Sequence, residues 1–282
     1  FNQTGDIEMR KTALFISAIL LLGLLSLPSM GKTDTLMMAT TTSTDNTGLL
    51  DHLAPMFQKD TSIELKWTAV GTGKALKMGQ NCDVDVLLVH APAAEKRYVA
   101  DGYGVDRREV MYNDFVIIGP PNDTAGIKGM KLVGAMKTIA EKGALFVSRG
   151  DNSGTNKKEI SLWKIAGLSV PDKESWYLQT GQGMIKTILV AEERKGYTMT
   201  DRGTYIKYEA NKKGYPPLKI LVQGDPSLFN QYSVMAVNPT RCRNVKHELA
   251  TKFADWIISP KIQEVIGAYK LLGKKLFTPN AK

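Results

Sequence analysis

The chain of 282 residues contains only two cysteines and three histidines, and they are widely spaced. Cys82 and Cys242 have no His pair near them, so the spacing of a zinc site is absent and no metal cation is predicted to bind. The histidines His52, His90 and His247 are scattered along the chain and are expected to be structural. In an oxidising compartment the two cysteines can form a disulfide, and their pairing is left open.

The sequence also lacks the motifs of common hydrolases. It contains no Gly-x-Ser-x-Gly pattern, no His-Glu-x-x-His pattern and no cluster of His, Asp and Glu. Ser43 and Ser153 would be candidate nucleophiles only if a histidine lay near them, and none does in the sequence. We therefore predict that the protein is not an enzyme and has no catalytic residue. An exported phosphate-ester hydrolase is the alternative from another functional class.

Long apolar runs are absent except near the start of the chain. The run from Ala13 to Leu27 follows Arg10 and Lys11 and precedes the small-residue pattern Ser29-Met30-Gly31. This arrangement is typical of a cleaved signal peptide, and the run is shorter than the ~20 residues that span a bilayer. We assign residues 1–31 to a leader and signal peptide. No cysteine follows the run to carry a lipid, so a periplasmic protein is expected.

The charge is strongly positive but dispersed. The net charge is +9, and lysine doublets such as Lys157-Lys158 and Lys212-Lys213 take the place of a long basic run. No nucleic-acid motif accompanies them, so we expect the charge to steer small anions rather than to bind nucleic acid. The hydrophobic content of 43% allows one large core or two medium ones.

Strand and helix patterns alternate along the chain, which indicates an α/β fold with helices on both faces of a sheet. Asp83 to Val89 is a nearly continuous apolar strand of the kind buried in a parallel sheet, and residues 92–100 form the next helix. The strand Tyr112 to Ile118 leads into the breaker Gly119-Pro120-Pro121, where we place a crossing into a second domain. The turn Gly224-Asp225-Pro226 marks the return.

Three loops rich in hydroxyls or glycine lie between an apolar strand and a helix: residues 40–48, 71–74 and 148–155. The unpaired N–H groups and the positive dipole at a helix start favour a bound oxyanion. Arg149 adds a guanidinium that can form a bidentate pair with such an anion. The alternatives are ordinary helix caps and a surface ion pair between Arg149 and Asp151. The Gly71–Lys74 loop is too short for a P-loop, which disfavours nucleotide binding.

The chain carries a series of ordered motifs: Thr40-Thr41-Thr42-Ser43 followed by Asp-Asn-Thr-Gly-Leu-Leu, Gly71-Thr72-Gly73-Lys74-Ala75-Leu76, Asp83-Val84-Asp85-Val86 running to His90-Ala91-Pro92, Tyr112-Asn113-Asp114-Phe115, the loop from Ser148 to Thr155, Thr180-Gly181-Gln182-Gly183-Met184, Asp201-Arg202-Gly203-Thr204-Tyr205 and Gly224-Asp225-Pro226. Taken together, they resemble the tungstate-binding proteins of bacterial ABC importers, the TupA family, over nearly the whole mature length. Cys82 and Cys242 match no motif associated with that family.

The resemblance implies a periplasmic binding protein fold of type II, with two α/β lobes joined by a two-strand hinge and a ligand cleft between them. It implies domain I at residues 32–113 and 229–282 and domain II at 114–228. The expected ligand is tungstate or molybdate, with no cofactor, and the expected partners are an ABC permease and its ATPase. A monomer is expected. The residues expected to bind the ligand are Thr40, Thr41, Thr42, Ser43, Thr72, Gly73, Arg149, Ser153, Gly154 and Thr155.

Hydroxyls, N–H groups and one guanidinium are hydrogen-bond donors, and they suit a dianion that carries only acceptors. Hydrogen phosphate carries a proton, and leaving it without an acceptor costs about 1–3 kcal/mol. An inward-pointing Asp45 or Asp151 would therefore favour phosphate, so another tetrahedral oxyanion is the alternative ligand. Side chains alternate along an extended segment, so Thr40 to Ser43 cannot all face the anion.

Overall fold

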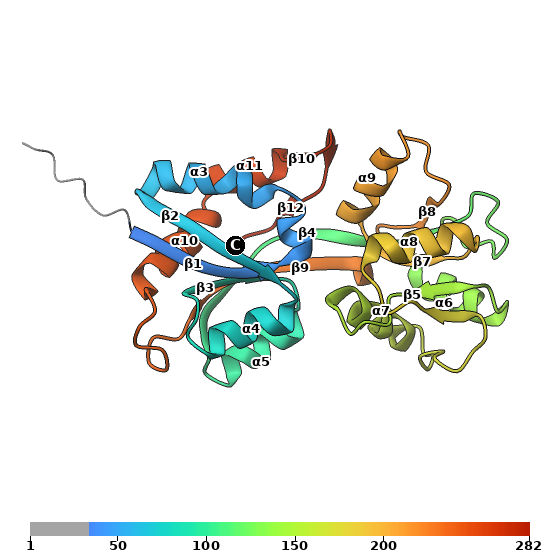
Figure 1. The fold of residues 1–282 in the computed structure, drawn as a ribbon, viewed down its shortest axis with the longest axis horizontal. Helices are drawn as coiled ribbons and strands as arrows, with labels where there is room; N and C mark the ends of the chain where they lie inside the picture. Colours follow the sequence, from blue (N-terminus) through green and yellow to red (C-terminus); the bar gives the residue numbers. More distant parts are fainter. Residues whose placement is uncertain (1–33) are drawn as a thin grey trace, which may run out of the picture. The chain divides into compact units, whose positions relative to one another are not determined.

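The strand β4 (Gly104–Gly119) connects the two lobes of the molecule. The structure is a computed structural model that describes residues 34–282. The first part of β4 pairs in antiparallel fashion with β9 (Phe229–Val237), and the last pair of that ladder joins Asp114 to Phe229. From Phe115 onward β4 pairs instead with β7 (Thr198–Asp201) and β8 (Lys219–Val222). In Figure 1, β4 and β9 run from one group of elements to the other.

The first lobe is built on a mixed sheet. Its parallel strands are β1 (Asp34–Thr41), β2 (Ile63–Val70) and β3 (Val86–Val89), with β1 between the other two. Next to β3 lies β9, which runs antiparallel to it, so the order across the sheet is β12-β4-β9-β3-β1-β2. The apolar strand predicted near residues 83–89 is therefore parallel to one neighbour and antiparallel to the other.

Helices cover both faces of this sheet, as the alternating pattern predicted. The helices α3 (Leu49–Thr61), α10 (His247–Ile257) and α11 (Pro260–Ala268) place Phe57, Phe253 and Ile262 in one buried cluster. The helices α4 (Thr72–Gln80) and α5 (Pro92–Ala100) place Leu76 and Tyr98 in another. Short elements complete the lobe: α2 (Thr42–Asp45), β10 (Lys270–Leu271), β11 (Lys274–Lys275) and β12 (Thr278–Pro279).

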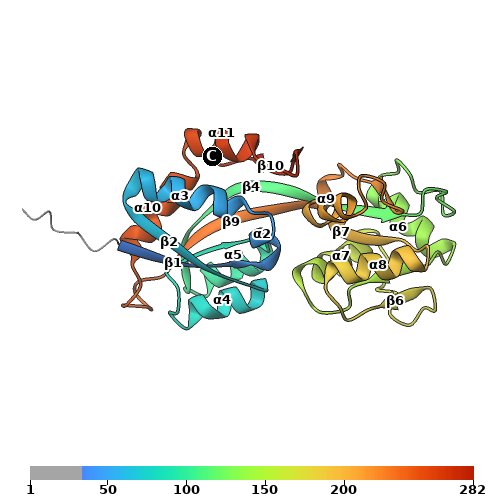
Figure 2. The ribbon, with the colours of Figure 1, turned by 45° about the horizontal axis from the view of Figure 1, so that its top comes forward.

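The second lobe repeats this layering with its own core. Its remaining strands are β5 (Phe146–Ser148) and β6 (Tyr177–Gln179), which pair in parallel. The helices are α6 (Leu132–Glu141), α7 (Gly154–Ile165), α8 (Met184–Glu193), α9 (Arg202–Asn211) and the 3-10 turn η1 (Pro226–Leu228). One buried cluster holds Met136 and Trp163 from α6 and α7, and a second holds Ile188 and Tyr205 from α8 and α9. Figure 2 shows α6, α7, α8 and α9 around β7.

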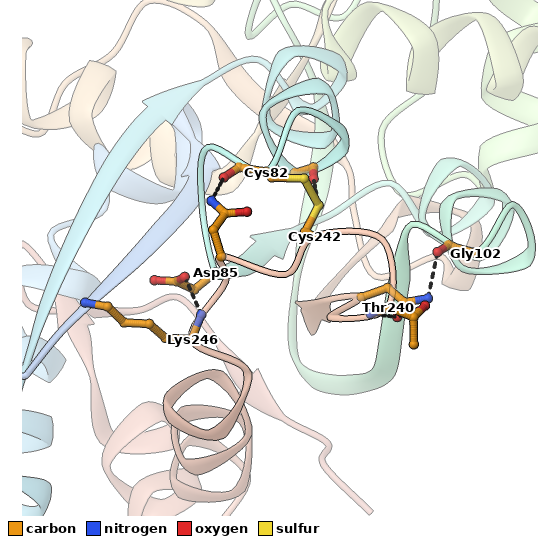
Figure 3. The surroundings of a disulfide bond; sticks show 9 residues. Cys82, Asp85, Gly102, Thr240, Cys242 and Lys246 are labelled. Atoms are coloured by element: carbon orange, nitrogen blue, oxygen red, sulfur yellow. Dashed lines mark hydrogen bonds between the residues drawn. A yellow bond between two sulfur atoms is a disulfide. The ribbon is translucent and has the colours of Figure 1, made fainter.

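Cys82 and Cys242 form a disulfide, with their Cα atoms 5.4 Å apart. It joins the turn before β3 to the segment after β9, which answers the question that the sequence left open (Figure 3). Beside it, the Asp85 carboxylate accepts hydrogen bonds from the backbone N–H groups of Met37 and Lys246, each over 2.8 Å. The disulfide and Asp85 thus fix the end of the sheet at which β3 begins.

The signal peptide predicted at residues 1–31 lies outside the described residues. Within residues 34–282, no helix combines the length and the apolar character that crossing a bilayer requires.

Candidate functional site

A cavity of about 250 Å³ lies where the C-terminal ends of β1 and β3 face the second lobe. Ligands of open α/β sheets bind at this edge, beyond the carboxyl ends of the strands. The first lobe contributes Thr41, Thr42, Ser43, Asn46, Val70, Gly71, Thr72 and His90. The second lobe contributes Arg149, Ser153, Gly154, Thr155, Gly183, Met184, Ile185, Asp201 and Thr204. All three loops singled out in the sequence therefore reach one cavity.

The hydroxyl cluster that ends β1 divides between the core and the cavity. Thr40 is fully buried, and its hydroxyl donates to the carbonyl of Leu88 over 2.7 Å. The structure therefore does not bring Thr40 to the cavity, because its side chain points into the sheet. Thr41, Thr42 and Ser43 do line it. Alternation along β1 separates Thr40 from Thr41, and Thr42 and Ser43 lie beyond the strand, in α2.

The second loop brings Thr72 to the cavity at the first residue of α4. No side chain caps the start of this helix, because its N-cap residue is Gly71. Its first N–H groups are therefore unpaired within the helix and available to an acceptor. Gly73, which the sequence analysis had included, is not among the residues that line the cavity.

Arg149 lines the cavity and is also half of an ion pair. Its Nε and Nη2 donate to the Asp151 carboxylate over 3.1 Å and 2.5 Å. Burial opposes ionisation of Asp151, but hydrogen bonds from Ser153 and Arg149 outweigh it and lower the pKa of Asp151. Among the described residues, none accepts a hydrogen bond from Nη1 of Arg149. The interpretation as an ion pair and the interpretation as a ligand group are thus compatible.

The same loop supplies the start of α7. The Ser153 hydroxyl accepts from the N–H of Asn156 over 3.3 Å, so Ser153 caps the helix. Gly154 lies across the cavity from the first lobe: a Cβ at this position would be 3.8 Å from His90 and 4.0 Å from Thr72. The absence of a side chain at Gly154 therefore keeps the two lobes close here without filling the space between them.

The buried carboxylate of Glu159 holds the loop of residues 148–155 in place through hydrogen bonds. Glu159 accepts hydrogen bonds from the Ser148 hydroxyl over 2.5 Å, the Tyr177 hydroxyl over 2.6 Å and the Trp163 indole over 3.0 Å. Its neighbour Asn156 donates to Ser148 over 3.3 Å. Burial raises the pKa of Glu159, and these hydrogen bonds counteract the rise. The network fixes both ends of the loop that presents Arg149.

His90 is the cavity residue that the sequence analysis assigned to structure alone. Its Nε2 lies 2.9 Å from the Ser43 hydroxyl and 3.0 Å from the Thr41 hydroxyl. Its Nδ1 lies 2.9 Å from Oδ1 of Asn230. The separation of 47 residues between Ser43 and His90 concealed this contact, although the two residues follow β1 and β3, which pair directly in the sheet.

The loops before α8 and α9 were also missed as parts of the site, although their motifs contributed to the family resemblance. Gly183, Met184 and Ile185 line the cavity at the start of α8, whose N-cap has no side-chain hydrogen bond. Asp201 caps α9 and accepts from the N–H and the hydroxyl of Thr204, over 2.8 Å and 2.6 Å. The helices α4, α7, α8 and α9 therefore all begin at the cavity, and their dipoles favour an anion there.

The acidic residues considered in the sequence analysis do not line the cavity. Asp45 accepts from the indole of Trp67 over 2.7 Å, and Asp151 is engaged by Arg149. Among residues 34–282, only Asp201 brings a carboxylate to the lining, and both of its oxygens accept hydrogen bonds from Thr204. Within the described part of the chain, no group of three or more His, Cys, Asp or Glu could hold a metal cation. The cavity is thus rich in donors and suits a small anion.

A family model described as the PBP superfamily domain matches residues 28–261. The tungstate-binding protein TupA of Campylobacter jejuni is 54% identical over 240 residues, which cover 85% of this chain and 89% of that protein. A solved structure of the tungstate-binding protein TupA from Desulfovibrio alaskensis is 67% identical, with a TM-score of 0.86, and the match covers 88% of this chain and all of that one. The solved tungstate ABC transporter protein from Geobacter sulfurreducens is 50% identical, with a TM-score of 0.74 over 83% of this chain and 98% of its own.

Proposed function

Because the chain belongs to the periplasmic binding protein superfamily and, within it, to the TupA family, we propose that it captures tungstate and delivers it to an ABC importer. The observation that carries this proposal is the cavity between the lobes, to which both lobes contribute donors. Molybdate, which nearly matches tungstate in size and charge, is an expected second ligand. The ligand-binding residues that we propose from the sequence and that reach the cavity are Thr41, Thr42, Ser43, Thr72, Arg149, Ser153, Gly154 and Thr155.

The balance of donors and acceptors favours a fully ionised dianion over hydrogen phosphate. A dianion accepts from the hydroxyls, from Arg149 and from the starts of the four helices. Hydrogen phosphate must also donate its proton, and the Asp201 carboxylate of the lining already accepts one hydrogen bond from Thr204 on each oxygen. A phosphate whose proton does not reach Asp201 has an unmet donor, which costs about 1–3 kcal/mol, so we expect phosphate to bind more weakly. Sulfate carries no proton, and its exclusion rests on the size of the cavity.

The anion is held between two lobes that close around it. Residues 32–113 and 229–282 form domain I and residues 114–228 form domain II, with the crossings in β4 and before β9. The pairing of β4 passes from β9 to β7 between Asp114 and Phe115, which supports a hinge at this point. Flexing of a few residues there would change the width of the cavity with each lobe moving as a rigid body.

The protein acts in the periplasm as a monomer, after export by the signal peptide, and its partners are a permease and an ATPase of the importer. The disulfide is consistent with an oxidising compartment. Close relatives named for tungstate binding, rather than for a reaction, support a role without catalysis.

One observation favours a second candidate, an exported hydrolase. Ser43, His90 and Asn230 are linked by hydrogen bonds of 2.9 Å each, in the order of a nucleophile, a base and an orienting residue. However, Thr41 lies 3.0 Å from the same imidazole nitrogen and competes with Ser43 for it. Chromogenic phosphate and carboxylate esters, assayed with the wild type and Ser43→Ala, separate the two functions. Turnover that Ser43→Ala abolishes would favour the hydrolase, and we expect none.

The proposed function is tested by isothermal titration calorimetry of the protein with sodium tungstate. We expect one anion to bind per chain, and the absence of binding would overturn the proposal.

A further inference from the structure

The hydrogen bonds of His90 determine which of its ring nitrogens carries a proton. Asn230 donates through Nδ2 to Oδ1 of Asn113 over 2.8 Å, which identifies Oδ1 of Asn230 as the acceptor that faces His90. The Nδ1 of His90 must therefore be the donor of that bond. In the neutral ring only one nitrogen carries a proton, so Nε2 is then an acceptor.

An acceptor at this position works against the proposed ligand. Nε2 faces the hydroxyls of Thr41 and Ser43, and in a neutral ring it accepts a hydrogen bond from one of them. Thr41 already accepts from the N–H of Thr44 over 3.2 Å and shares a further hydrogen bond of 2.6 Å with the Thr44 hydroxyl. Few hydroxyl protons therefore remain to point into the cavity. A dianion needs donors, because each of its oxygens can only accept.

We propose, building on the proposed function, that His90 takes up a proton when the oxyanion binds, so that Nε2 changes from acceptor to donor. The hydroxyl that donated to Nε2, from Thr41 or Ser43, is then released to donate toward the anion, and the imidazolium adds a positive charge beside the cavity. His90 is thus a positioning residue that acts through the two hydroxyls. By linkage, anion binding and protonation of His90 strengthen each other by the same factor.

The charged and titratable groups around His90 are consistent with this switch. From β9, the Tyr232 ring lies 4.8 Å from the His90 ring between centroids, and burial raises the pKa of Tyr232 so that it stays neutral. Burial lowers the pKa of His90, and the hydrogen bond with Asn230 and the negative charge of Asp201 at the start of α9 counteract part of this effect. From the second lobe, Arg149 lines the same cavity, but Asp151 offsets its charge. Without an anion, desolvation dominates and lowers the pKa of His90, which keeps the ring neutral.

Calorimetry with sodium molybdate, a dianion near neutral pH, tests the proposal. Titrations in two buffers of different ionisation enthalpy, at about pH 6.5 and about pH 8, give the number of protons taken up per anion. We expect uptake of up to about one proton, with the affinity falling by at most about tenfold for each unit of rising pH. His90→Gln should bind with no uptake. The matched control His52→Gln, on the exposed side of α3, should behave like the wild type.

A second variant keeps the test decisive if His90→Gln fails to fold. Asn230→Asp places a carboxylate at Nδ1, which favours the imidazolium before any anion arrives. It should reduce the proton uptake and weaken the pH dependence of the affinity. Binding by the wild type without proton uptake, or equal uptake in His90→Gln, would overturn the role of His90. Unchanged uptake in Asn230→Asp would overturn it as well. Failure of the wild type to bind tungstate or molybdate at all would instead overturn the proposed function.

Discussion

At the scale of the residue, Arg149 provides the guanidinium of the cavity, and Asp151 holds it in place. The ion pair leaves Nη1 for a ligand and fixes the plane of the group before the ligand arrives. Such preorganisation saves the entropy of ordering a long side chain during binding. The carboxylate that was a rival partner in the sequence analysis thus becomes a support for the binding group.

Arg149→Ala is expected to weaken tungstate binding by about 2 kcal/mol, or roughly thirtyfold, because a charge-assisted hydrogen bond to the anion is lost. Calorimetry measures the change. Arg97→Ala is the matched control, because that side chain on α5 is 84% exposed and is not part of the lining. Equal affinity of Arg149→Ala and Arg97→Ala would remove Arg149 from the site.

His90 should also make the ligand-free protein sensitive to acid. Desolvation lowers the pKa of His90 in the folded state below the value of about 6.5 in the unfolded chain. The unfolded state then binds more protons below about pH 6.5, so the contribution of His90 to stability is complete above this pH and is lost as the pH falls. Urea denaturation between about pH 5 and pH 8 should show this decline, and His90→Gln should show a smaller one. An identical decline in both proteins would contradict the assignment.

Many residues of the site could be predicted from the sequence, because loops rich in hydroxyls or glycine between a strand and a helix form a recognisable local pattern. Thr41, Thr42 and Ser43 were predicted together with Thr40, but the pattern did not reveal that Thr40 bonds to Leu88 in the neighbouring strand. His90 was not predicted as a site residue. Its role depends on contacts with strands far away in the sequence, which local patterns do not encode.

At the scale of the element, the sequence pattern predicted the helix α5 over Pro92–Ala100 with its observed bounds. It missed the first half of β4, where Arg107 and Arg108 interrupt the apolar pattern. Arg107 pairs with Glu95 of α5 over 2.9 Å, and Arg108 pairs with Asp255 of α10. Acidic partners from other elements neutralise these two arginines. A continuous strand therefore forms over a segment whose polar sequence is typical of a loop.

The disulfide should contribute strongly to stability and little to binding. It closes a loop with a sequence separation of 160 residues, for which the loss of chain entropy in the unfolded state corresponds to on the order of 5 kcal/mol as an upper estimate. The double variant Cys82→Ser and Cys242→Ser is therefore expected to unfold at clearly lower urea concentration, with the affinity for tungstate preserved.

Reduction of the wild type by dithiothreitol supplies the control for this prediction. It should lower stability to that of the double variant, and the double variant should not respond to the reductant. A double variant as stable as the oxidised wild type would show that the disulfide has no stabilising role.

At the scale of the whole molecule, the α/β class follows from the alternation of strands and helices. The Gly-Pro-Pro breaker, where the crossing was placed, lies at the end of β4, whereas the pairing of β4 changes earlier, between Asp114 and Phe115. The sequence did not reveal that β9 returns antiparallel to β3, because pairing direction depends on how the chain re-enters the sheet after the second lobe. Nor did it reveal the width of the cavity, which depends on how closely Gly154 approaches His90 and Thr72.

The central claim is that a donor-rich cavity between two lobes grips a small dianion and performs no chemistry on it. Competitive calorimetry of the purified protein with tungstate, molybdate, sulfate and phosphate tests this claim most directly. We predict tight binding of tungstate and molybdate at one site per chain, with phosphate weaker by at least about tenfold, which corresponds to about 1.4 kcal/mol. Binding of phosphate as tight as that of tungstate, or no binding of either metal oxyanion, would contradict the account.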